Sequence, residues 1–257
     1  MTKQLLVVIT IAFTVRLVAQ VRQIQTREGD RRPLETAAET LERTYGWIVT
    51  YEDVPYMFSG DTDDVSDSIC RSNCNQIEHR TLVPRSTPYA YSLDEDKAKE
   101  GELGAPVVIA ALLDAHNRSG NPGKFHALAV RVPGGPMVFH LIPHEMRDEH
   151  GQPKAYRPLL DTRITLSPGK RSLDTILDEI EAKLQAATGV EFVTAAIGSN
   201  YLRQTEVDFE AKDEVARDVL RRLLIEKTGP SSWLMMCDPS VFHRFCSLNI
   251  HRVQPVK

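Results

Sequence analysis

Apolar residues recur at helical spacing in two stretches of the C-terminal part of the chain. One stretch predicts a helix that begins at Ser172 and stops at Gly189, with its acidic residues away from the apolar stripe. The other predicts a helix from about Asp213 to Lys227, which ends before Gly229-Pro230. The first stripe comprises Leu173, Ile176, Leu177, Ile180 and Leu184, and the second comprises Val215, Ala216, Val219, Leu220, Leu223 and Leu224.

Segments of β-type pattern flank and separate these helices. They alternate apolar and polar residues or are rich in β-branched and aromatic side chains. The order becomes β-α-β-β-α-β-β over residues 159–257, which has the size of one small α+β domain. The predicted strands cover residues 159–166, 190–197 and 205–211, Trp233–Cys237 and Cys246–Val253.

The first half repeats this order more loosely. It predicts a helix over residues 33–46, a strand over 47–53, a helix from Ala105 to Asn117, and a hairpin of residues 124–132 and 137–146. Both halves open with Arg-x-Leu-acid-Thr before a helix, a glycine and a β-run, which indicates an internal repeat. The sequence therefore predicts an α+β fold with two related β-α-β-β-α-β-β halves, in which helices pack on small mixed sheets.

The boundaries follow from these patterns. The first half covers residues 33–158 and contains a long loop, 54–103, with short strands around Asp64–Ile69 and Tyr89–Leu93. The second half covers 159–257, and residues 21–32 are polar and predict a linker.

Residues 1–20 have the pattern of a secretory signal peptide. Lys3 precedes an apolar run from Leu5 to Val15, which is too short to span a bilayer comfortably. A retained anchor or a first strand is the alternative interpretation. We expect an exported, periplasmic or secreted protein, with cleavage after Ala19 or Gln20.

Composition excludes several classes of protein. The chain has 257 residues, 42% of them hydrophobic and 26% charged, as in soluble globular proteins. Its net charge is −4, and removal of residues 1–20, which hold Lys3 and Arg16 and no acid, makes it −6. We therefore expect no nucleic-acid partner. We also expect no integral membrane segment after the leader.

The four cysteines form two local pairs, Cys70/Cys74 and Cys237/Cys246. In an oxidising compartment, disulfides within each pair are the simplest connectivity. Cys237 and Cys246 lie on apolar strand faces, and a hairpin would place them side by side. Buried free thiols are the alternative for both pairs.

Three histidines and three acids gather at the end of the second predicted hairpin strand. His140, His144, Glu145 and His150 make a zinc or manganese site conceivable. The spacing is not His-Glu-x-x-His on a helix, and a strand followed by a loop gives no fixed ligand geometry. We therefore expect polar strand ends here, with no metal, no cofactor and no catalytic residue.

The second half resembles the short N-terminal domain shared by secretins and TonB-dependent transporters. The resemblance rests on the helix ending in Thr188-Gly189, on the helix from Ala216 to Thr228-Gly229, and on the last strand with Leu248 and Ile250. It covers some 95 residues in order of elements, and the first half shares it only through Leu34–Tyr51. Such domains bind other proteins in the periplasm and carry no catalytic residues, and small exported proteins are built from them.

We therefore expect a non-enzymatic protein-interaction module of the cell envelope, with an envelope protein as partner. The alternative is a secreted metal-dependent hydrolase that uses the His140, His144 and His150 region. An enzyme predicts that these side chains converge with a carboxylate in a pocket, whereas a binding module predicts that they are scattered.

Overall fold

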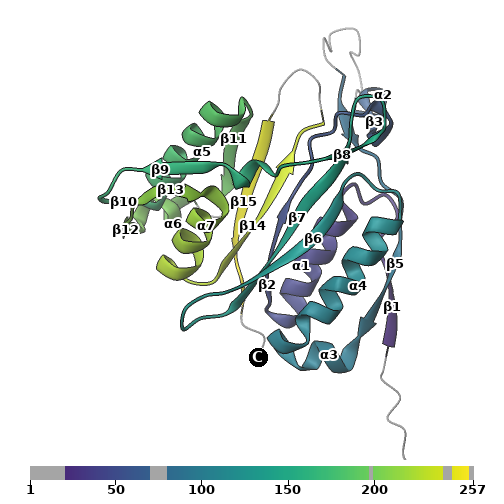
Figure 1. Cartoon of the computed structure of the whole chain (residues 1–257), viewed down its shortest axis with the longest axis horizontal. Coiled ribbons are helices and arrows are strands. Elements are labelled where there is room, and N and C mark those ends of the chain that lie inside the picture. Colours follow the sequence, from purple (N-terminus) through teal and green to yellow (C-terminus); the bar gives the residue numbers. More distant parts are fainter. Residues whose placement is uncertain (1–20, 70–79, 197–198, 240–244, 255–257) are drawn as a thin grey trace, which may run out of the picture.

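The computed structural model describes residues 21–69, 80–196, 199–239 and 245–254 and shows a mixed α+β fold, which confirms the predicted fold class. One mixed sheet, with the strand order β11-β15-β14-β2-β7-β6 and with β8 paired to β7, runs through the molecule (Figure 1). Its strands are β2 (Ile48–Glu52), β6 (Lys124–Arg131), β7 (Met137–Arg147), β8 (Pro153–Ala155), β11 (Glu191–Ala196), β14 (Ser231–Cys237) and β15 (Phe245–Arg252).

Four main helices pack on this sheet, and local sequence signals set their ends. Pro33 occupies the first turn of α1, where its missing N–H has no cost, and Gly46 ends the helix at φ 67°. The Ser172 hydroxyl accepts the N–H of Thr175 at the start of α5, and Gly189 ends it at φ 70°. These helices are α1 (Pro33–Tyr45), α4 (Ala105–Arg118), α5 (Leu173–Thr188) and α7 (Ala216–Arg221), which continues into a π-helical segment (Arg222–Lys227).

The last helix begins later than the sequence predicts. Residues expected in its first turn belong instead to β13 (Ala211–Val215), which pairs with β9 (Arg163–Leu166). Asp213 adopts φ 52° at an irregularity of this ladder, a conformation incompatible with a helix. The predicted apolar stripe is correct from Ala216 onward, because its residues pack into the core beneath the helix.

The two helix pairs cover opposite faces of the main sheet at its two ends (Figure 1). On β2, Ile48 joins the core beneath α5 and α7, while its neighbour Val49 joins the core beneath α1 and α4. On β14, Trp233 and Leu234 divide in the same way. Side chains of one strand therefore contribute alternately to two cores.

Both helix pairs are accompanied by the same arrangement of strands. The strand after α1, β2, is parallel to β7, and β7 is antiparallel to β6, the strand after α4. The strand after α5, β11, is parallel to β15, and β15 is antiparallel to β14, the strand after α7. Parallel pairing of β14 with β2, called the central junction below, joins the two three-stranded groups into one sheet.

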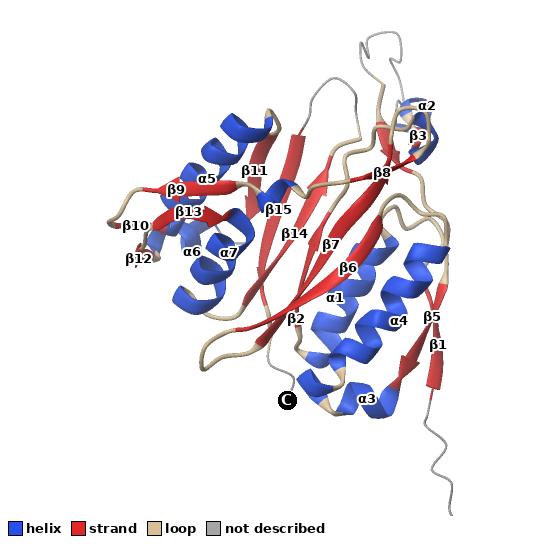
Figure 2. Cartoon of the chain, in the orientation of Figure 1, coloured by secondary structure: helices blue, strands red, loops and turns tan. Residues whose placement is uncertain are grey.

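Small two-stranded sheets flank the main sheet (Figure 2). Residues 21–25, which the sequence places in a linker, form β1 and pair with β5. The pairs are β1 (Val21–Gln25) with β5 (Ala90–Asp94), β3 (Thr62–Asp64) with β4 (Leu82–Pro84), β9 with β13, and β10 (Lys170–Ser172) with β12 (Glu206–Asp208). The remaining short elements are α2 (Ser66–Ile69), α3 (Glu95–Lys99), α6 (Ser199–Gln204) and the 3₁₀ turns Ser59–Asp61, Gly101–Leu103 and Leu159–Asp161.

Within residues 54–103, one of the two predicted strands is found at the expected place, as β5. The other, expected around Asp64–Ile69, is a strand end followed by the helical turn α2. The Asp64 carboxylate accepts the N–H of Ser66 at 3.0 Å, and this local hydrogen bond starts the turn.

Candidate functional site

A cleft of about 440 Å³ lies where the parallel strands β14, β2 and β7 end. Cys237 is the last residue of β14, Pro55–Met57 follow β2, and Met146 is near the end of β7. Ligands of open sheets with parallel strands bind outside the carboxyl ends of those strands. The volume lies within the range of ligand pockets. We call this candidate site the carboxyl-end cleft.

Most side chains that line the carboxyl-end cleft are apolar or aromatic. Met57 is 42% exposed although it is a large apolar residue, whereas Met146 is buried. Methionine is flexible and polarizable, and it is common on surfaces that accept several partners. The apolar lining consists of Pro55, Tyr56, Met57, Met146, Tyr156, Leu159, Val190, Pro239 and Phe245, with Cys237 and Cys246.

Beneath the cleft, the Asp53 carboxylate fixes two lining residues. Asp53 is 1% exposed, and Arg32 pairs with it at 2.8 Å while also donating to the Cys237 carbonyl at 2.6 Å. Burial and the nearby Asp53 charge raise the pKa of Tyr56 well above its usual value, so its hydroxyl stays protonated. Asp53 accepts hydrogen bonds from Arg32 Nε, the Tyr51 and Tyr56 hydroxyls, and the N–H groups of Val54 and Cys237.

The predicted bridge between Cys237 and Cys246 is present. The two residues face each other in the β14–β15 ladder, with Cα atoms 4.0 Å apart. Both are buried, and they join the two strands at the edge of the cleft. The predicted hairpin, which places the two cysteines side by side, is thereby confirmed. Cys70 and Cys74 lie outside the described residues.

A second buried ion pair lies beside the cleft, on the other face of β2. Glu52 is fully buried, and Arg217 from α7 donates to both of its carboxylate oxygens. Arg217 also donates to Asp161 at 2.6 Å. Burial raises the pKa of Glu52, and the hydrogen bonds from Arg217 oppose that rise. Asp161 shares a 3₁₀ turn with Leu159, which lines the cleft, so the pair ties this lining segment to β2 and α7.

The charged side chains that line the cleft, among the described residues, are both acidic. They are Glu149, in the turn after β7, and Asp238, next to the disulfide. Glu149 lies 3.7 Å from His150, and both side chains are mostly exposed. Because most of the lining is apolar, the cleft favours a ligand with apolar side chains.

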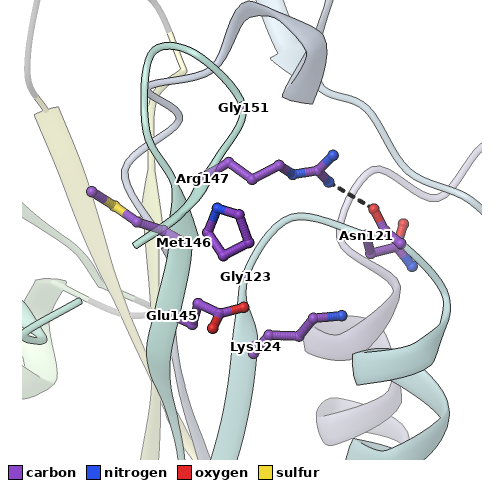
Figure 3. Close-up of a pocket in the computed structure, with 9 residues that line it drawn as sticks. Asn121, Gly123, Lys124, Glu145, Met146, Arg147 and Gly151 are labelled. Atoms are coloured by element: carbon purple, nitrogen blue, oxygen red, sulfur yellow. Dashed lines mark hydrogen bonds between the residues drawn. The ribbon is translucent and has the colours of Figure 1, made fainter. Parts of the chain in front are cut away.

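A smaller pocket of about 220 Å³ lies on the other side of β7 (Figure 3). Lys124 and Glu145 face each other across the β6–β7 ladder, and Arg147 pairs with Asp61 at 3.0 Å. Arg147 also donates to the Gly120 carbonyl at 2.7 Å. The charges of Lys124, Glu145, Arg147 and Asp61 sum to zero, so the pocket offers no net charge to a ligand.

The structure does not bring together the residues of the alternative metal site. His140 is 1% exposed and its Nδ1 lies 2.7 Å from the Thr50 hydroxyl. Burial lowers its pKa to about 3, so it is neutral. His144 packs against His126, with ring centroids 5.4 Å apart, and His150 is exposed in the turn after β7. Among the described residues, no group of three or more His, Cys, Asp or Glu has the arrangement of a metal site.

Sequence reasoning missed Asp53, Met57 and Arg217. Asp53 ends a run of β-type residues, and a carboxylate at the end of a buried strand is a signal that could have been weighed. Arg217 gives no such signal, because it lies outside the predicted apolar stripe of its helix. Its partner Glu52 is 165 residues away in the sequence and contacts it only in the folded chain.

Comparisons of the chain with protein-family models, with curated proteins and with solved structures find no match. The resemblance to the secretin and TonB-dependent transporter domain therefore stays a prediction. In the part of the chain that the structure describes, each helix is too short or too polar to cross a bilayer.

Proposed function

We propose that this chain is an exported protein-interaction module of the cell envelope, and that it binds an apolar segment of a partner protein in the carboxyl-end cleft. The observation that carries the proposal is an apolar cleft of about 440 Å³ in which Met57 remains 42% exposed. Exposed large apolar residues beside a cavity mark interaction sites.

The support beneath the cleft favours binding without rearrangement. The Cys237–Cys246 disulfide and the Arg32–Asp53 ion pair hold the lining from below. A binding site that is ordered before its ligand arrives loses less conformational entropy on binding. The cleft therefore acts as a preformed receptor for a short segment.

Two features support export. Residues 1–20 have the pattern of a signal peptide, although they lie outside the described residues. The chain also contains a disulfide, and structural disulfides persist in oxidising compartments. A periplasmic or secreted location is consistent with both.

The shared strand order supports an origin of the two halves by internal repetition. Both halves place a parallel strand beside the second strand of a hairpin, and both follow the order helix, strand, helix, hairpin. The order of elements in the second half is also the one expected for the secretin and TonB-dependent transporter domain that its sequence resembles. Such domains bind other proteins in the periplasm, so we propose an envelope protein as the partner.

Selection of peptides tests the proposal. Random seven-residue peptides displayed on phage are selected on the wild-type chain, and the enriched peptides are then tested on a Met57→Asp variant. The expected peptides share apolar residues and bind the variant at least tenfold more weakly. Enrichment of peptides without apolar residues, or equal binding to Met57→Asp, would contradict the proposal. A Leu103→Asp variant, whose residue is 81% exposed and distant from the cleft lining, serves as control.

A further inference from the structure

The main sheet ends in two strands whose outer edges no other strand of the described chain pairs with. These are β6 at one end and β11 at the other. An unpaired edge presents backbone N–H and C=O groups to a further strand. The chain itself contains an example of such a pairing. At the central junction, β14, which corresponds to β6, pairs with β2, which corresponds to β11.

At the central junction, each half buries an apolar residue in the core of the other half. Leu234 of β14 is 2% exposed and belongs to the core beneath α1 and α4. Ile48 of β2 is also 2% exposed and belongs to the core beneath α5 and α7. Each side chain faces away from the helices of its own half, so the neighbouring half covers it.

The free edges carry apolar residues with the same orientation, but uncovered. Leu128 of β6 lies opposite His140 in the ladder, on the face away from α1 and α4, and it is 42% exposed. Val193 of β11 follows the buried Phe192, faces away from α5, and is 40% exposed. Leu128 thus corresponds to Leu234, and Val193 corresponds to Ile48.

The outer edge of β6 is blocked at one position only among its described contacts. The Asn117 side chain binds both backbone groups of Phe125, at 2.8 and 2.9 Å. Because backbone groups alternate in direction, Ala127, Ala129 and Arg131 point their N–H and C=O to the same outer side. Ala127 and Ala129 are exposed, which leaves room for a partner strand.

The charges of the two edge strands are complementary. β6 contains Lys124 and Arg131 and no acid, whereas β11 contains Glu191 and no base. Arg131 already pairs with Glu102 of the neighbouring 3₁₀ turn, so Lys124 is the base of β6 that faces Glu191 when β11 lies beside β6. Two copies of β6 side by side would place like charges together, whereas β6 beside β11 places opposite charges together.

From these observations we infer that a second copy of this chain extends the sheet, with its β11 paired in parallel to β6 of the first copy, as β2 pairs with β14 at the central junction. The helix α5 of the added copy then covers Leu128. The contact is head-to-tail, so every added copy offers a new free β6 edge.

Sedimentation velocity of four chains and one mixture tests this arrangement. Leu128→Lys blocks the β6 edge, and Val193→Lys blocks the β11 edge. Val21→Lys adds the same charge at an exposed residue of β1, which pairs with β5 and not with the main sheet. Near-ultraviolet circular dichroism shows that each variant is folded. We expect the wild type and Val21→Lys to grow in mass with concentration, and each edge variant to self-associate at least tenfold more weakly.

The mixture distinguishes a head-to-tail contact from a symmetric one. An equimolar mixture of Leu128→Lys and Val193→Lys has one intact edge of each kind, so we expect 1:1 dimers that grow no further. A wild type that stays monomeric at about 100 µM, a mixture that stays monomeric, or loss of association by only one of the two edge variants would overturn the inference.

Discussion

The carboxyl-end cleft and the pocket of Figure 3 share Met146 of β7, yet their linings differ in charge and in packing. In the pocket, Lys124 faces Glu145 and Arg147 pairs with Asp61, and glycine-rich turns surround them. In the cleft, the ion pairs lie beneath the lining and the lining itself is apolar.

The two sites use their charged residues differently. In the pocket, the charges of Lys124, Glu145, Arg147 and Asp61 sum to zero. In the cleft, Arg32–Asp53 and Arg217–Glu52 hold the backbone in place, and apolar side chains remain available above them. The cleft therefore keeps apolar side chains at its surface, whereas the lining of the pocket is largely polar and glycine-rich.

The largest expected effect comes from the buried pair beside the cleft. Arg217→Met leaves the buried Glu52 without its partner, and we expect the free energy of unfolding to fall by about 3–5 kcal/mol. The exposed pair of Arg163 and Asp213 is the matched control, and Arg163→Met should cost at most about 1 kcal/mol. Urea unfolding of both variants measures the difference, and equal losses would contradict this role of the buried pair.

Loss of the disulfide is expected to have the next largest effect. The double variant Cys237→Ala/Cys246→Ala removes a link across nine residues of sequence, so the unfolded chain gains entropy. We expect a loss of about 2–3 kcal/mol in urea unfolding without reductant. Binding of selected peptides should weaken as well, since both residues line the cleft. Unchanged stability would show that the cleft does not depend on this bridge.

The support beneath the cleft should also respond to pH through Glu35, in the first turn of α1 near Arg32. Burial, then the charge of Glu39, raises the pKa of Glu35 to about 7. A raised carboxyl pKa favours the protonated form on folding, so wild-type stability falls as pH rises from about 4.5 through 7.

Glu35→Gln removes that penalty. We therefore expect the variant to gain about 1 kcal/mol relative to the wild type at pH 8, and to gain little at pH 4.5. Thermal unfolding at both pH values measures the difference. A gain that is the same at both values would contradict the assignment.

The smallest effect on stability is expected at Met57, the residue on which the proposed binding depends most. Met57→Ser changes a half-exposed side chain, so we expect unfolding to change by less than about 0.5 kcal/mol. Affinity for selected peptides should nevertheless fall at least tenfold. Leu103→Ser is the control for loss of an exposed apolar residue elsewhere, and it should bind as the wild type does.

Local features of the fold could be predicted well from the sequence. The starts and ends of α1 and α5 follow from Pro33, Ser172 and the glycines at 46 and 189, because these signals act within one turn. The hairpin of Cys237 and Cys246 was predictable because the two cysteines lie close in sequence and on matching faces.

The site could not be predicted in the same way. Arg32, Asp53 and Cys237 come from three distant segments, and only the parallel pairing at the central junction brings them together. The histidines of 140–150 lie close in sequence, and polar strand ends were the expectation there, with a metal site as the alternative. Burial of His140 and an extra residue at His144 in the β6–β7 ladder direct these side chains to different surroundings.

Methionine methyl resonances provide the most direct test of binding in the carboxyl-end cleft. Met57 and Met146 line it, whereas Met137 and Met235 do not. The chain, labelled with ¹³C at methionine methyl groups, is titrated with pooled seven-residue peptides composed of Leu, Phe, Pro, Met and Lys. We predict saturable shifts of the Met57 and Met146 signals, with Met137 and Met235 unchanged. Signals of Met57 and Met146 that stay constant at millimolar peptide would contradict the proposed function.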